Sequence, residues 1–136
     1  MDSVLVSDLQ PRAVQWLQSA KNLVREAGDT RVRSEYASLV RGLPALLHQS
    51  GLFQTIAYLE SRSRRASNGP TAHGLVLAHL ASLLSPFTGM KELKTDGLTR
   101  MNLHEYLVVS RLSLEASSWL KRMVEIQFGD EEEPHA

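Results

Sequence analysis

The stretch Asn102–Phe128, NLHEYLVVSRLSLEASSWLKRMVEIQF, decides the fold class of this 136-residue chain, and it contains no glycine and no proline. Asn102, with Glu105 three residues later, has the form of a capping box, which marks the start of a helix. From Leu103 to Ile126 apolar residues recur at steps of three and four, as on the buried side of a helix. The pattern predicts one long helix with an apolar side broad enough to contact several neighbours.

Similar but shorter apolar repeats precede this segment and indicate further helices. We expect four of them, running from Asp8 or Pro11 to Gly28, from Tyr36 to Leu47, from Leu52 to about Arg65, and from Thr71 to near Pro86. Pro44 removes an intrahelical hydrogen bond, so the second helix is expected to be kinked or broken there. Gly51 is its expected C-cap. Two segments are expected as loops, 66–70 (ASNGP) and 87–100, the latter with a short turn around 91–94.

The composition agrees with a helical protein. The chain has 22 Leu and 12 Ala against 10 Val and 2 Ile, a mixture that favours helix over sheet. Its length allows one hydrophobic core. The predicted fold is therefore all-α, a single compact bundle of five to six helices ending in a long helix. The bundle domain is expected to span residues 1–129, followed by an acidic, disordered segment, 130–136.

The charges are distributed unevenly along the chain. Fifteen basic residues balance fifteen acidic ones, but four of the acidic residues form the run Asp130–Glu133, so residues 1–129 carry a net charge of +4. No apolar stretch reaches the roughly 20 residues that a membrane span needs. Asp2 stands where a signal peptide would have a basic residue. We therefore expect a cytoplasmic protein with no membrane association.

No reactive centre is indicated by the sequence. The absence of cysteine excludes disulfides, thiolate metal sites and a cysteine nucleophile. Phosphate-loop, GxSxG and HExxH motifs are absent. His73 and His79 are six residues apart and cannot share a helix face, so no metal or other cofactor is predicted. His79 has two possible roles: a hydrogen-bonded core imidazole, or the phosphoryl carrier of a phosphotransfer domain.

Clusters of like charge are the strongest indication of a binding surface. Lys21 and Arg25 are spaced i, i+4, whereas Lys121 and Arg122 are adjacent, and Arg62, Arg64 and Arg65 crowd one expected helix end. Like charges at such spacing repel each other, and a polyanion would relieve the repulsion. Ordinary solvated side chains are the alternative. Without aromatic residues between the cations, phosphate contact is expected rather than stacking on bases.

Two stretches resemble the small subunit of type III-B CRISPR effector complexes, the Cmr complexes. The first is Leu39–Arg62, LVRGLPALLHQSGLFQTIAYLESR, in which the matching positions are Arg41, Leu43, Pro44, Gly51, Leu52, Gln54, Thr55, Tyr58 and Leu59. The second is Glu105–Met123, EYLVVSRLSLEASSWLKRM, which matches at Tyr106, Leu107, Arg111, Glu115, Trp119, Leu120, Lys121 and Arg122. Gly42, where the family usually has a basic residue, and the acidic segment depart from the pattern.

This resemblance implies a non-catalytic helical subunit of an antiviral complex. Such subunits stack with copies of themselves beside the backbone subunits, while RNA cleavage and signalling chemistry belong to the backbone and large subunits. Guide RNA and target RNA pair in the groove between them. Arg41, Lys121 and Arg122 are then the first candidates for phosphate contact, and Lys21, Arg25, Arg62, Arg64 and Arg65 are the second.

Alternatives remain open at this point for two residues and for the whole chain. An internal salt bridge is the alternative role of Arg41, and Trp119 is expected in the core rather than against RNA. For the whole chain, the alternatives are a stand-alone helical module that binds a protein partner through its wide last helix, and a phosphotransfer domain that uses His79.

Overall fold

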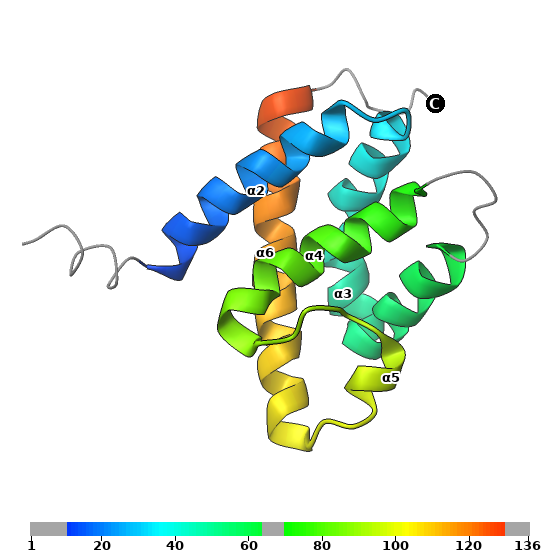
Figure 1. Ribbon diagram of the computed structural model, residues 1–136, viewed down its shortest axis with the longest axis vertical. Coiled ribbons are helices and arrows are strands. Elements are labelled where there is room, and N and C mark those ends of the chain that lie inside the picture. Colours follow the sequence, from blue (N-terminus) through cyan, green and yellow to red (C-terminus); the bar gives the residue numbers. More distant parts are fainter. Residues whose placement is uncertain (1–10, 64–69, 130–136) are drawn as a thin grey trace, which may run out of the picture.

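The computed structural model describes residues 11–63 and 70–129. Throughout these ranges the regular secondary structure is helical, in the order α2 (Arg12–Gly28), α3 (Arg33–Ser63), α4 (Ala72–Thr88), α5 (Thr95–Leu98) and α6 (Leu103–Phe128). The long helix α6 contacts α2, α3 and α4, which pack around it (Figure 1). The predicted all-α bundle with a long final helix is confirmed.

One hydrophobic core is shared by all five helices. Trp16 on α2 is 1% exposed, and its indole nitrogen donates a 2.7 Å hydrogen bond to the carbonyl of Leu83 on α4. Gly28 ends α2 as predicted and lies against Phe128, where an added Cβ would stand 3.1 Å from the ring. The small residue therefore lets the end of α2 approach the end of α6.

Helix α3 changes direction at Gly51 and not at Pro44. Gly51 has φ 83° and ψ 168°, which confirms the predicted helix end there, while the backbone stays helical through Pro44, so the break considered at Pro44 is wrong. Glycine adopts a positive φ without steric cost, and this ends the first half of α3. Amides after the break need new acceptors, and the N–H of Phe53 donates to the Tyr106 hydroxyl on α6 at 3.0 Å.

The middle of the chain differs from the prediction in two places. Thr71 caps α4 as expected, accepting from Gly74 N at 3.0 Å, but α4 passes Pro86 and ends at Thr88, before the left-handed Gly89. Pro86 is exposed, so water can satisfy the carbonyl that lacks its donor. The short turn lies at 95–98, one turn after the predicted 91–94, because Glu60 on α3 accepts from the Thr95 amide at 3.0 Å.

Helix α6 begins with the predicted capping box. Asn102 Oδ1 accepts from the Glu105 amide at 2.8 Å, and Glu105 Oε1 accepts from the Asn102 amide at 3.0 Å. Among the described helices, none is long and apolar enough to cross a membrane. Predictions that concern Asp8, Arg64, Arg65, most of the loop 66–70 and the acidic segment 130–136 fall outside the described residues.

Candidate nucleic-acid interface

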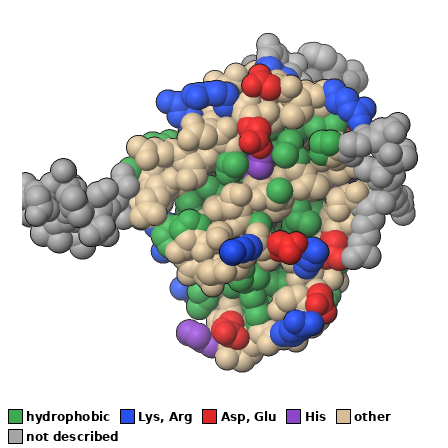
Figure 2. Space-filling model, viewed as in Figure 1, with side chains coloured by type: hydrophobic (Ala, Val, Ile, Leu, Met, Phe, Trp, Pro, Cys, Tyr) green, Lys and Arg blue, Asp and Glu red, His purple; other side chains and the backbone are tan. Residues whose placement is uncertain are grey.

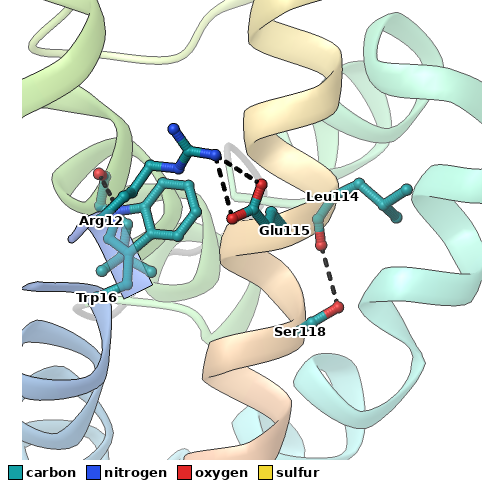
Figure 3. A network of polar contacts seen from close by, with 6 residues as sticks. Arg12, Trp16, Leu114, Glu115 and Ser118 are labelled. Carbon is teal, nitrogen blue, oxygen red and sulfur yellow. Dashed lines mark hydrogen bonds and ion pairs between the residues drawn. The ribbon is translucent and has the colours of Figure 1, made fainter. Parts of the chain in front are cut away.

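A polar clamp fixes the start of α2 across the middle of α6. The guanidinium of Arg12 donates to both carboxylate oxygens of Glu115, at 3.0 and 3.3 Å (Figure 3). The same guanidinium lies 5.3 Å from the ring of Trp16, which is buried beneath it. Because one end of α2 is held in this way, the direction of α2 places its second half beside the last turns of α6.

Lys21 and Arg25 line a groove between α2 and α6. The apolar side chains of the groove are Leu17, Met123 and Ile126, and Gln127 joins its two sides by donating from Nε2 to the Lys21 carbonyl at 2.8 Å. Both cations are exposed. Lys21 and Arg25, two of the second candidates for phosphate contact, therefore lie at the end of α6 that carries the first candidates Lys121 and Arg122.

Lys121 and Arg122 lie on different sides of this part of α6, because successive residues of a helix are rotated by about 100°. Arg122 is exposed, and its guanidinium stands 5.7 Å from the ring of Trp119. It precedes Ile126 by one turn, so it borders the groove. Lys121 is half-buried. Trp119 packs partly buried against the core, as predicted.

Lys21, Arg25, Lys121 and Arg122 together are called the cationic end. Within residues 11–63 and 70–129, none of them forms an ion pair with a carboxylate. The opposite end of the bundle differs, because the cations beside α5 are paired there: Lys94 with Glu92 at 3.2 Å and Arg100 with Asp96 at 3.0 Å. In the lower part of Figure 2, Lys or Arg and Asp or Glu side chains accordingly lie side by side.

Arg41 occupies a different position, on α3. It is half-buried and donates from Nη2 to the carbonyl of Gly129, just beyond the end of α6. Arg33, also on α3, lies 4.3 Å from the ring of Phe128 and donates to the Gly28 carbonyl at 3.5 Å. Arg41 therefore has a structural contact of its own, to a backbone carbonyl at the end of α6.

Arg62 lies apart from the other candidates. It is exposed near the end of α3 and stands 5.5 Å from the ring of Tyr58. The Tyr58 hydroxyl lies 3.3 Å from Nε2 of His73 on α4. Arg62 thus lies beside the Tyr58–His73 contact between α3 and α4. Arg64 and Arg65 are outside the described residues.

His79 forms a buried polar chain between α3, α4 and α2. Nδ1 of His79 lies 2.8 Å from the Tyr36 hydroxyl, and Nε2 lies 3.0 Å from Oε1 of Glu26. A carboxylate can only accept, so Nε2 carries the proton, and Nδ1 accepts from Tyr36. Burial lowers the pKa of His79 despite the hydrogen bond and charge of Glu26, and burial raises the pKa of Tyr36. The neutral forms of His79 and Tyr36 are therefore favoured.

This geometry argues against the phosphotransfer alternative. A phosphoryl carrier must present a free imidazole nitrogen to its partner, whereas His79 is 2% exposed and both of its ring nitrogens are occupied. The interpretation of His79 as a hydrogen-bonded core imidazole agrees with these contacts. No cluster of three or more metal-binding side chains occurs in the part of the chain that the structure describes.

Comparison with known proteins identifies the family. Residues 10–127 match the sequence profile of the CRISPR-associated protein family Cas_Cmr5. This chain belongs to the Cmr5 family. The match includes both stretches on which the predicted resemblance was based, so that prediction is confirmed.

Individual relatives agree with this assignment. The "CRISPR system Cmr subunit Cmr5" of Thermus thermophilus is 32% identical over 117 residues, which cover 86% of this chain and 96% of the relative. The protein of the same name from Thermotoga maritima is 26% identical and covers 93% of this chain and 92% of the relative. A crystal structure of the Cmr5 family protein from Thermus thermophilus superposes with a TM-score of 0.71, at 31% identity, over 87% of this chain and 97% of that one.

Sequence reasoning missed Arg33 and the Arg12–Glu115 clamp. Glu115 stands out in the sequence only as a position shared with the family. Arg33 follows Arg31, which lies in the short connection from α2 to α3, and this local excess of positive charge was the signal that could have found it.

Proposed function

We propose that this chain is the small, non-catalytic subunit of a type III-B CRISPR Cmr complex acting in the cytoplasm in antiviral defence. Membership of the Cmr5 family supports this proposal, since relatives matched over most of their length are named as Cmr subunits. The occupied imidazole of His79 agrees with a non-catalytic role. The partners are then the backbone and large subunits, further copies of this chain, and the guide and target RNAs.

Within such a complex, the cationic end contacts RNA phosphates. The observation that carries this proposal is the position of Lys21, Arg25, Lys121 and Arg122 at one end of the α2–α6 pair without carboxylate partners among the described residues. Exposed cations beside the backbone of a strand release its counterions, which favours binding. Arg41 adds charge close to this surface while holding the end of α6.

The proposed contact is independent of base sequence. Guide pairing reads the sequence of the target, so a subunit that only holds the strand needs cations and no base-edge donors. Arg122 already faces the Trp119 ring within its own chain. We expect the four side chains of the cationic end to act as point charges along the backbone.

A paired substitution tests the proposal. Lys121→Ala with Arg122→Ala should weaken the binding of single-stranded RNA of any sequence and flatten the slope of log affinity against log salt by up to about 2 units. The matched control is Lys91→Ala with Lys94→Ala, which removes the same charge beside α5. Fluorescence anisotropy with two RNAs of different sequence measures both slopes. Equal slopes in the two variants would contradict the proposal.

A second surface is proposed to meet neighbouring copies. Leu103 and Leu107, one turn apart near the start of α6, are 73% and 55% exposed, and Val108 is 42% exposed. These three residues are called the apolar end. Burial of exposed apolar area drives association, so this end supplies a contact for stacking beside the backbone subunits.

A further inference from the structure

The break in α3 borders a groove between α3 and the first half of α6, here called the α3–α6 groove. Gly51, at the break, has φ 83°, and a Cβ added there would meet no other side chain within 4 Å among the described residues. The space above Gly51 is therefore open. The groove has a volume of about 330 Å³, at the lower end of the range of clefts that hold ligands.

The inside of the α3–α6 groove is aliphatic. Leu47 and Leu52 on α3 are 6% and 2% exposed, and Leu107 and Leu114 line the side formed by α6. Leu107 is 55% exposed, so an apolar side chain placed here would remove further apolar area from water. Among the described residues that line the groove none is Phe, Tyr or Trp. The groove therefore lacks the rings on which nucleobases stack.

The rim of the groove carries a cation without a carboxylate partner among the described residues. Arg111 is exposed, and Glu115, one turn further along α6, is engaged by Arg12 through both of its oxygens. His48, also exposed, adds an imidazole N–H on the α3 side. No Asp or Glu is among the described residues that line the groove. A carboxylate beside an apolar group therefore complements this surface.

We propose that the α3–α6 groove binds an aliphatic side chain of a different protein subunit, with an adjacent carboxylate of that subunit on Arg111. The partner segment is defined by its chemistry, as a Leu, Ile or Val within two residues of an Asp or Glu. That this subunit belongs to a Cmr complex rests on the proposed function, whereas the chemistry of the groove does not. Leu107 is shared with the apolar end, so the groove extends the surface proposed to meet protein neighbours.

A second copy of this chain complements the groove less well. Its exposed pair of suitable chemistry on α6 is Glu125 with Ile126, which is 67% exposed. Ile126 lies beside Lys21 and Arg25, with which it lines the groove between α2 and α6. Docking of this pair on Arg111 would bring cations against a cation, and like charges across an interface weaken binding. A subunit of different sequence avoids this repulsion.

A photo-crosslinker inside the groove tests which molecule occupies it. The chain has no cysteine, so Ser110→Cys, at a position that lines the groove, takes a single benzophenone maleimide before the complex is reconstituted. The crosslinked peptide should come from a different subunit and contain an aliphatic residue within two positions of an Asp or Glu. Lys91→Cys, exposed beside α5, is the control label and should not give this peptide. Crosslinks only to RNA or to another copy, or none, would overturn the proposal.

Charge reversal tests the ion pair. Arg111→Glu should lower the affinity of the chain for the remaining subunits at least about tenfold at low salt and by less at high salt, because repulsion replaces attraction across the interface. Lys91→Glu makes the same change of charge outside the groove and should lower the affinity less than about twofold. Replacement of the crosslinked carboxylate by Lys in the partner should restore binding to the Arg111→Glu variant.

Biolayer interferometry with the other subunits immobilised measures these affinities. Equal affinities of the two variants, or no restoration by the reversed partner, would overturn the proposal while leaving the proposed function in place. Failure of the unmodified chain to join the complex would overturn the proposed function and the identity of the partner together. The two failures are therefore distinguished by the unmodified chain.

Discussion

The two halves of α6 present different surfaces although they form one uninterrupted helix. The first half, at the end of the bundle beside α5 in Figure 1, exposes Leu103 and Leu107. In the second half, Leu120 and Val124 are fully buried, and the exposed residues are the cation Arg122 and Ile126, which is 67% exposed in the groove that Lys21 and Arg25 line. The difference arises because α2 crosses only the second half, held by the Arg12–Glu115 and Gln127–Lys21 contacts. Under the proposed function, one helix serves a protein neighbour at one end and a polyanion at the other.

The largest expected effect compares the same substitution in the two halves. Leu120→Ala should lower the free energy of unfolding by about 2–5 kcal/mol, because it leaves a cavity in the core. Leu107→Ala should cost less than about 1 kcal/mol, because the side chain is already 55% exposed. Urea denaturation of both variants measures the difference. Similar losses in the free energy of unfolding would show that Leu120 and Leu107 are buried to a similar extent.

A smaller effect concerns the contact between Glu26 on α2 and His79 on α4. Helix α2 is the one that covers the second half of α6. Burial lowers the pKa of His79 in the folded protein, so the unfolded chain binds a proton first as pH falls. Stability should therefore be complete above the ordinary histidine value of about 6.5 and decrease below it, by at most about 1.4 kcal/mol per pH unit for this proton.

The measurement is urea denaturation of the native chain and of His79→Gln from about pH 8 down to about pH 5, the range in which histidine titrates. The variant cannot titrate at this position, so its stability should depend less steeply on pH. The other histidines are present in both proteins, so the difference between the two curves isolates His79. Parallel curves would show that His79 is not the responsible group.

A still smaller effect tests whether the two ends act separately. Leu103→Ser with Leu107→Ser should weaken self-association in the presence of the backbone subunits by about tenfold, because exposed apolar area that associates with a neighbour is lost. The salt dependence of RNA binding should not change. Sedimentation velocity measures the first quantity and anisotropy the second. A change in both quantities would show that the apolar end and the cationic end do not act separately.

Features set by neighbouring residues were predictable from the sequence. The Asn102–Glu105 capping box, the Thr71 cap and the end of α2 at Gly28 each depend on residues within one turn. The end of the first half of α3 at Gly51 was predicted as a C-cap, whereas the break considered at Pro44 does not occur. Both Pro44 and Gly51 can interrupt a helix, and the tertiary contact of Phe53 with Tyr106 accompanies the break at Gly51.

The candidate site was predictable in its charges but not in its grouping. Pairs such as Lys21 and Arg25 are visible as i, i+4 neighbours, whereas their proximity to Ile126 and Gln127 depends on how α2 crosses α6. Arg62 is equivalent to them in the sequence pattern but belongs to the contact with His73 and Tyr58. Partners distant in sequence, such as Arg33 and Phe128, become apparent only in three dimensions.

The central claim is that the cationic end is the surface that lies along RNA, and an NMR titration of the full chain with single-stranded RNA tests it most directly. We expect the largest amide shift changes in residues 21–25 and 119–127 and little change in residues 103–108, with the changes reversed by added salt. Shifts concentrated at the apolar end, or an absence of shifts in residues 21–25 and 119–127 at saturating RNA, would contradict the claim.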